Sequence, residues 1–169
     1  GVGVLKKLLD VFHREEPSRG VTQGCNNMAE ANKHGFAQLL DIAGYNYYGD
    51  RIVPGKPPSE DWSFRCMYDN EHETYPDRIL IGSENCSALI TRGIYHDPIP
   101  MNRWSKVKPD FYCSAYDITS EVPLMILNTR PYVCGMFTWE GFDYIGEPTP
   151  YQWPSRSSNF GIVDLCGFP

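Results

Sequence analysis

The sequence lacks long hydrophobic runs and any excess of positive charge. No stretch approaches the roughly 20 apolar residues of a membrane-spanning helix, so we expect no membrane partner. Its 169 residues include 15 Lys or Arg against 21 Asp or Glu, for a formal net charge of −6. Nucleic-acid binding normally needs a basic face that neutralises phosphates, so we expect no nucleic-acid partner either. With 41% apolar residues, the chain has the composition of one folded domain.

The sequence also lacks the local motifs that hold metals and nucleotides. Its six cysteines form no CxxC pair, and neither GxGxxG nor GxxxxGK[ST] follows an expected strand. We therefore predict no metal site and no cofactor. An even number of cysteines would permit disulfides, but a chain of this length can bury a core without them. We expect reduced cysteines, with Cys25, Cys86 and Cys134 acting as small hydrophobic residues.

Helical patterns and strand-like apolar runs alternate along the chain. Helices are expected within residues 2–13, 28–40, 59–75 and 114–127. Strands are expected within residues 20–25, 39–47, 78–84 and 132–139. This alternation is typical of α/β proteins with a parallel sheet, whose strands are apolar because both faces are covered. Two architectures fit, an open doubly wound sheet and part of a (β/α)8 TIM-type barrel.

Polar and aromatic residues stand where three of the expected strands end. They are Asn46 and Tyr47, then Glu84, then Trp139 with Glu140. In a (β/α)8 barrel the carboxyl ends of the strands carry the active site, so this placement favours the barrel. A carboxylate directly after a buried strand is costly unless it is paired or lies in a solvated cleft. The structural alternative for Glu84 is a carboxylate stabilised by the positive end of the next helix.

A carboxylate beside a tyrosine and a tryptophan is typical of a sugar-binding cleft. An indole can stack on the apolar face of a sugar ring, and a phenol can donate a hydrogen bond that keeps a carboxylate ionised. Retaining glycosidases use two carboxyl groups roughly 5–5.5 Å apart, one as nucleophile and one as acid/base. The pattern therefore indicates glycoside hydrolysis, with a non-catalytic carbohydrate-binding module and an α/β scaffold domain as alternatives.

Longer motifs around these positions resemble glycoside hydrolase family 2, in particular its bacterial β-galactosidase-type members. The matching segments cover residues 16–22, 41–47, 81–84, 91–95, 113–117, 137–151, 153–158 and 160–164. The resemblance implies that the chain holds strands five to eight of a catalytic (β/α)8 barrel. Residues 1–169 would then be the C-terminal half of that barrel, with the N-terminal half and the accessory β-sandwich domains absent.

The resemblance also implies roles for individual residues. Glu84 would be the nucleophile that forms a glycosyl-enzyme, and Tyr47 would donate a hydrogen bond to it. Trp139 would form the floor of the sugar subsite, while Asn46 and Asn159 would contact sugar hydroxyls. The acid/base glutamate of the family would precede residue 1, so the fragment alone is expected to be inactive.

Other residues of similar type could be mistaken for those of the site. Tyr48 lies one residue from Tyr47, and a slip in register would exchange them. The pair Asn70-Glu71 has the order of the family's acid/base motif, but it falls in an expected crossover, where we predict a solvated role. Asp143 and Glu147 lie in the loop motif after the fourth expected strand, where we predict that they brace the loop.

Departures from the family pattern bear on the substrate. Ser87 stands where long β-galactosidases place a histidine, which disfavours a nearby magnesium site, and the Asn-x-Lys motif of β-glucuronidases does not occur. The expected partner is therefore a carbohydrate substrate with a terminal β-galactoside, while β-glucosides and β-mannosides remain alternatives. The compartment, bacterial cytoplasm or periplasm, stays open.

A half barrel would leave the backbone groups of its two outer strands unpaired. Such edges pair readily with other chains. We therefore expect the isolated chain to self-associate, or to pair with the missing half of the barrel.

Overall fold

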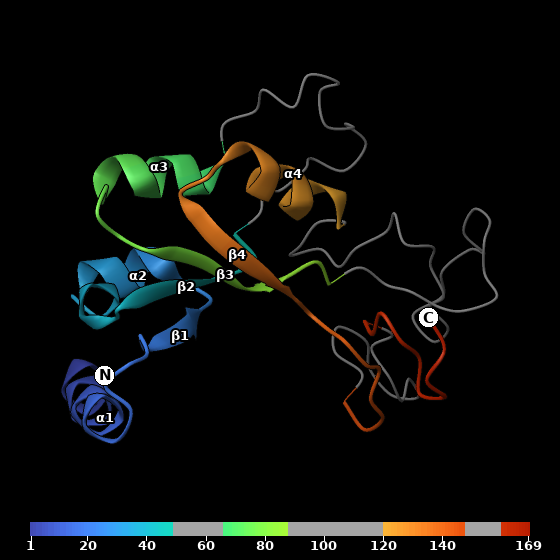
Figure 1. The fold of residues 1–169 in the computed structure, drawn as a ribbon, viewed down its shortest axis with the longest axis horizontal. Helices are drawn as coiled ribbons and strands as arrows, with labels where there is room; N and C mark the ends of the chain where they lie inside the picture. Colours follow the sequence, from blue (N-terminus) through green and yellow to red (C-terminus); the bar gives the residue numbers. More distant parts are fainter. Residues whose placement is uncertain (49–65, 88–119, 148–159) are drawn as a thin grey trace.

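The chain forms a parallel four-stranded sheet in the computed structural model, which describes residues 1–48, 66–87, 120–147 and 160–169. The strands follow one another across the sheet in chain order, and each pair of neighbours is parallel (Figure 1). They are β1 (Thr22–Cys25), β2 (Ile42–Asn46), β3 (Leu80–Asn85) and β4 (Val133–Thr138). The predicted α/β class and all four predicted strands are thereby confirmed, β3 running one residue beyond its expected end.

Helices alternate with the strands, as the sequence predicts, but their bounds differ. They are α1 (Val2–Glu15), α2 (Met28–Lys33), α3 (Met67–Thr74) and α4 (Glu121–Thr129), with a short 3-10 helix η1 (Ala37–Leu39) after α2. The single helix expected over residues 28–40 is divided because Gly35 adopts a φ of 72°, which ends α2. The expected beginnings of the helices within 59–75 and 114–127 lie outside the described residues. None of the described helices is long and apolar enough to span a membrane.

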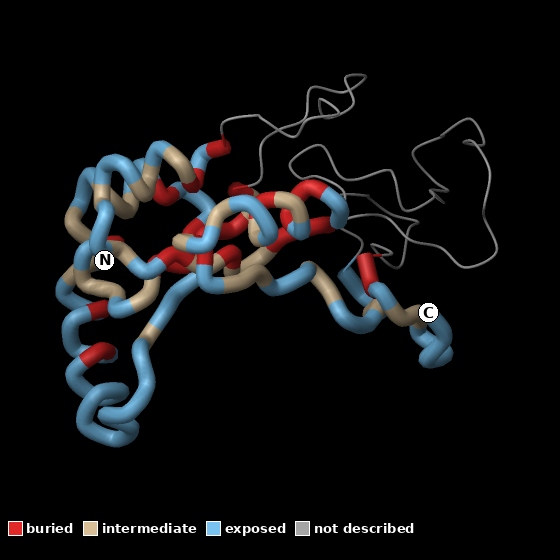
Figure 2. Tube along the Cα trace, turned by 45° about the horizontal axis from the view of Figure 1, so that its top comes forward, coloured by how far each residue is buried: buried red, intermediate tan, exposed pale blue. Residues whose placement is uncertain are grey.

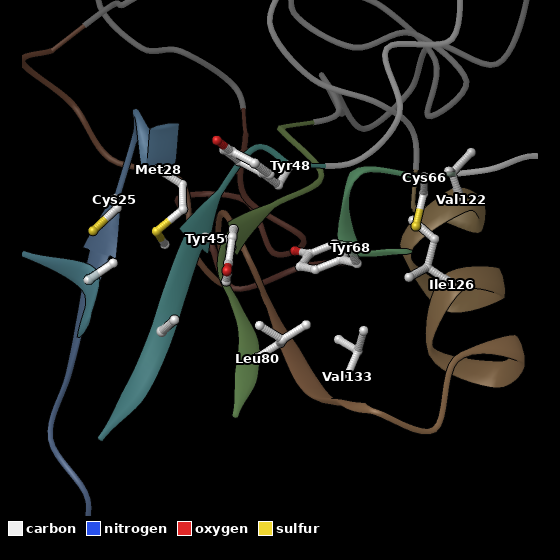
Figure 3. Close-up of a cluster of buried hydrophobic side chains, with 12 residues drawn as sticks. Cys25, Met28, Tyr45, Tyr48, Cys66, Tyr68, Leu80, Val122, Ile126 and Val133 are labelled. Carbon is white, nitrogen blue, oxygen red and sulfur yellow. The ribbon is translucent and has the colours of Figure 1, made fainter. Parts of the chain in front are cut away.

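One face of the sheet carries the main hydrophobic core. Helices α2, α3 and α4 contribute Met28, Tyr68 and Ile126, which belong to one buried cluster with the strand residues Leu80 and Val133 (Figure 3). All five are 5% exposed or less. Figure 2 shows the buried positions gathered along the sheet, whereas most of α1 is exposed. We call this the helix-covered face.

The opposite face, which we call the open face, carries small and polar residues within the described part of the chain. Cβ atoms built at Gly24 and Gly44 would point at Asn46 and Ser83 on this face. On β4, a register shift against β3 adds one residue between Val133 and Met136, so both contact the core. Their neighbours Cys134 and Phe137 therefore lie on the open face. Cys134 is exposed, and Phe137 is 63% exposed.

This arrangement confirms part of the expectation for the cysteines and corrects the rest. The five described cysteines are free, and Cys25, Cys66 and Cys86 are buried. Cys134 is not a buried small hydrophobic residue, because the strand that carries it lies at an edge of the described sheet and turns this side chain toward the open face.

Glu71 corrects a second expectation, because it is partly buried rather than solvated. Its side chain, 16% exposed, lies on α3 and accepts a 2.8 Å hydrogen bond from the Tyr45 hydroxyl. The Arg78 guanidinium donates to Glu71 at 3.1 Å and to the side-chain oxygen of Asn32 at 2.8 Å. A buried carboxylate needs such partners, so Glu71 joins α3 to α2 and β2 on the helix-covered face, away from the strand ends.

A second ion pair joins the beginning of α3 to the end of α4. Arg130 donates to both carboxylate oxygens of Asp69, from Nε at 3.0 Å and from Nη2 at 3.1 Å. The backbone N–H of Cys66 and the hydroxyl of Tyr132 also donate to this carboxylate. Burial by itself would raise the pKa of Asp69, but these hydrogen bonds outweigh it and hold the pKa well below its usual range.

Replacing Asp69 with Asn should therefore lower the free energy of unfolding by roughly 2–4 kcal/mol, since it leaves the Arg130 guanidinium mostly buried without its counter-charge. The pKa of Asp69 is lower in the folded chain than in the unfolded chain. Its contribution is therefore complete well above the unfolded value of about 3.9 and is lost as the pH falls through that value toward the folded one.

Equilibrium denaturation of the full-length protein from pH 7 to pH 3 checks this. The Asp69→Asn variant should lose less stability on acidification than the parent protein. Asp77→Asn, at an exposed turn position, is the matched control and should leave both stability and its pH dependence unchanged. Equal acid sensitivity of parent and Asp69→Asn would contradict the assignment.

Candidate active site

The carboxyl ends of β2, β3 and β4 are joined by backbone hydrogen bonds. The N–H of Tyr47 donates to the carbonyl oxygen of Glu84 at 2.7 Å, and the N–H of Trp139 donates to that of Asn85 at 2.7 Å. Because the strands are parallel, their carboxyl ends meet at one edge of the sheet. The structure thus brings the backbones of Tyr47, Glu84 and Trp139 together, as the sequence predicts. Asn159 lies outside the described residues.

A β-bulge in β3 sets the direction of Glu84. Along β2 and β3, Tyr45 is aligned with Gly82, but the next residue, Asn46, is aligned with Glu84. The pairing with β4 also shows a register shift between Gly82 and Asn85. Strand β3 therefore contains one extra residue after Gly82 relative to both of its neighbours, which is the definition of a bulge.

The bulge reverses the face on which Glu84 lies. A Cβ atom at Gly82 would lie 3.1 Å from the Tyr68 hydroxyl oxygen, so Gly82 faces the helix-covered side. Regular alternation would place Glu84, two residues later, on that same side. With the extra residue, Glu84 is aligned with Asn46 instead and shares its face, the open face of the sheet. Glu84 is half-buried there.

Asn46 is held between the two neighbouring strands. Its side-chain oxygen accepts a 2.7 Å hydrogen bond from the Ser83 hydroxyl, and its side-chain nitrogen donates to the oxygen of Asn26 at 2.8 Å. Only 6% of Asn46 is exposed. Both ends of the amide are thus engaged within the sheet, and the predicted contact of Asn46 with substrate stays a prediction.

The two adjacent tyrosines after β2 differ in their surroundings. Tyr48 is 8% exposed, and its ring packs edge-on against Tyr45 in the core of the helix-covered face (Figure 3). Burial raises the pKa of Tyr48. Tyr47 is half-buried and has a φ of 58°, a conformation that residues other than glycine seldom adopt. This placement favours Tyr47 over Tyr48 as the tyrosine of the site.

Trp139 begins a segment that folds back on itself. It packs against Phe160, which is 3% exposed, and an isolated parallel bridge pairs Phe142 with Val163. The Asp143 carboxylate accepts a 2.8 Å hydrogen bond from the N–H of Gly161, which confirms the bracing role predicted for Asp143. The corresponding role of Glu147 stays a prediction.

Glu140, at the strand end beside Trp139, is a further carboxyl group of the candidate site, and its position in the sequence assigns it no role. Burial raises the pKa of this carboxyl, and the charges of Asp143 and Glu147 raise it further. Its Oε1 atom is buried and has no hydrogen-bond partner within the described residues. The available signal was the position of Glu140 directly after Trp139, but burial of one of its oxygens is a property of the fold. Within the same residues, no group of three or more His, Cys, Asp or Glu side chains could hold a metal ion.

Comparison with known proteins finds similar sequences and folds among proteins named as β-glycosidases. No protein-family model matches the chain. The chain is 39% identical, over 178 aligned positions, to the β-galactosidase BoGH2A of Bacteroides ovatus, and the alignment covers 97% of this chain. It spans 19% of the length of that protein.

Solved structures share the fold at lower identity. A β-glycosidase from Bacteroides vulgatus has a TM-score of 0.66 at 24% identity, over 100% of this chain and 23% of that one. A β-D-glucuronidase from Dictyoglomus thermophilum has a TM-score of 0.65 at 16% identity, over 99% of this chain and 27% of that one. At these identities, the likeness establishes the fold alone.

The parallel sheet and its helix layer thus share the fold of these solved structures. The similarity to BoGH2A over 97% of the chain confirms the resemblance to glycoside hydrolase family 2 that the sequence motifs indicate.

Proposed function

We propose that this chain is the C-terminal half of the catalytic barrel of a retaining glycoside hydrolase, comprising strands five to eight. Four consecutive parallel strands with intervening helices support this, because a complete barrel of this type has eight. The chain spans 19% of BoGH2A, which is consistent with a part of one domain in a much longer protein. The first half of the barrel would supply strands one to four and the acid/base glutamate.

The observation that carries the proposal is the position of Glu84. It lies on the open face, at the carboxyl edge of the sheet, and its backbone is hydrogen-bonded to Tyr47 on one side. The next residue, Asn85, is hydrogen-bonded to Trp139 on the other side. A carboxylate, a phenol and an indole on three adjacent strand ends are suited to holding a sugar ring against a nucleophile.

The proposed reaction has two steps. Glu84 attacks the anomeric carbon and forms a glycosyl-enzyme ester, while the bond to the leaving oxygen breaks and the acid/base glutamate of the other half protonates that oxygen. Water then attacks the same carbon, gives its proton to the acid/base carboxylate, and displaces Glu84. The Tyr47 hydroxyl would donate a hydrogen bond to Glu84 and favour its ionised form. Trp139 would stack under the sugar, with Asn46 and Asn159 at its hydroxyl groups.

Terminal β-galactosides are the substrates that we propose. The relative with 39% identity is named a β-galactosidase, and the Asn-x-Lys motif by which β-glucuronidases read a carboxylate does not occur in the chain. The β-glucosides and β-mannosides differ from galactosides in the configuration of single hydroxyl groups, so they are the substrates to compare first.

Covalent labelling tests the proposal. The full-length protein should react with an activated 2-deoxy-2-fluoro-β-galactoside and gain one fluorosugar, which peptide mass spectrometry should locate on Glu84. Gluco- and manno-configured reagents should react more slowly. A non-catalytic carbohydrate-binding module would form no adduct, and an adduct on another carboxylate would contradict the role of Glu84.

A further inference from the structure

We propose that Ser83 and Asn46 are positioning residues, which hold the bulge of β3 and thereby aim the Glu84 carboxylate at the substrate. The inference rests on the proposed function, because it concerns how the nucleophile of that reaction is oriented. It concerns a row of hydrogen-bonded side chains that crosses the open face from Asn26 through Asn46 to Ser83, which we call the polar row.

Ser83 lies at the point where the bulge adds its extra residue. Gly82 is aligned with Tyr45 and Glu84 with Asn46, which leaves Ser83 without an aligned residue in β2. A bulge residue has no regular place in the hydrogen-bonded ladder. The Ser83 hydroxyl instead donates to the Asn46 oxygen at 2.7 Å, so a side-chain contact fixes the position that the ladder does not.

The contact lies directly beside the residue that must be oriented. Glu84 is preceded by Ser83, whose side chain is bonded to Asn46, and its own carbonyl oxygen accepts from the N–H of Tyr47 at 2.7 Å. The bulge is therefore hydrogen-bonded to β2 through the Ser83 side chain and, just beyond β2, to Tyr47 through the Glu84 carbonyl oxygen. If the bulge shifted by one residue, Glu84 would return to the helix-covered face, because each residue along a strand reverses the face.

Gly24 on β1 and Gly44 on β2 leave space for the side chains of the polar row, because neither carries a Cβ atom. A Cβ atom at Gly24 would lie 2.7 Å from the side-chain oxygen of Asn46. A Cβ atom at Gly44 would lie 2.9 Å from the Ser83 hydroxyl and 2.6 Å from the carbonyl oxygen of Gln23. At Gly24 the obstructing atom is the end of a side chain, so a methyl group there would displace the Asn46 amide without removing any polar group of the row.

These contacts permit a test by two independent changes in the full-length protein. Ser83→Ala removes the hydroxyl that reaches Asn46, and Gly24→Ala moves the Asn46 amide. Both variants should lower the rate of covalent labelling per active site by about 10- to 100-fold. In Ser83→Ala, which alters no residue proposed to contact the sugar, KM should stay within about twofold. Ser120→Ala, at an exposed residue without a side-chain hydrogen bond to its helix, is the matched serine control and should label at the parent rate.

Active-site titration distinguishes positioning from a merely structural role. The number of sites that react is counted by the fluorosugar bound at completion, and the rate constant is taken per reactive site. A positioning role predicts a full number of sites that each react slowly. If instead Ser83→Ala and Gly24→Ala reduced only the number of sites and left the rate per site unchanged, the inference would be wrong.

The inference and the proposed function fail in different ways. If labelling never occurs on Glu84 in the parent protein, the nucleophile assignment is wrong and the positioning role fails with it. If Glu84 is labelled in the parent and both variants react at the parent rate per site, only the positioning role is refuted.

Discussion

Replacing Glu84 with Gln should lower kcat of the full-length protein by about 10³-fold or more. The amide has nearly the shape of the carboxylate, so substrate binding should change little, but a neutral amide cannot form the glycosyl ester. Steady-state kinetics on an aryl β-galactoside, together with binding of a competitive inhibitor, measure the two effects separately. Near-normal turnover of the Glu84→Gln variant would refute the assignment of the nucleophile.

Two control variants remove a carboxylate elsewhere in the chain, so that the effect at Glu84 can be separated from a general loss of negative charge. Glu121→Gln, at an exposed position in the first turn of α4, should retain the parent kcat. Glu71→Gln should also retain the chemistry but reduce stability, because Glu71 accepts hydrogen bonds from Tyr45 and Arg78 away from the strand ends.

The variant Glu84→Ala, with its smaller side chain, tests the same role by the appearance of a new product rather than by a loss of turnover. In the presence of azide, which can attack the anomeric carbon from the side that the carboxylate vacates, it should form an α-glycosyl azide. Formation of the β-configured azide instead would contradict a nucleophilic role for Glu84.

The isolated 169-residue chain should self-associate, and the first half of the proposed barrel should suppress this and provide turnover. The open face of the described sheet has no helix layer like that of the opposite face, and it exposes Phe137 and Cys134. Strands β1 and β4 lie at the two edges of the described sheet, where their backbone groups can pair with another chain. Helix α1 also exposes an apolar stripe, made of Val4, Leu8, Val11 and Phe12.

Two measurements check this expectation. Multi-angle light scattering of the chain alone should give a mass well above its 19.3 kDa. Co-expression with the preceding segment of the polypeptide should give a complex of one copy of each, with β-galactosidase activity that neither part has alone. A monodisperse monomer, stable at high concentration, would contradict the half-barrel proposal even if Glu84 proved to be catalytic.

Local patterns predicted most of the secondary structure. Apolar runs bounded by turn residues located all four strands, because burial in a parallel sheet selects such runs directly. The helix after β1 was predicted too long, since the periodicity of residues 28–40 does not show that Gly35 takes a left-handed conformation. Glu71 was predicted to be solvated because it falls in an expected crossover, and that position does not reveal its hydrogen bonds with Tyr45 and Arg78.

The sequence by itself determined the parallel α/β class, the position of Glu84 at the end of a strand, and the family, because these depend on periodicity and on motifs that are continuous along the chain. Only the tertiary structure decided the face on which Glu84 lies. Inspection of one strand cannot reveal a bulge, since the extra residue exists only relative to the neighbouring strands. For the same reason, the sequence does not link Asn46 with Ser83, because their hydrogen bond joins residues 37 positions apart.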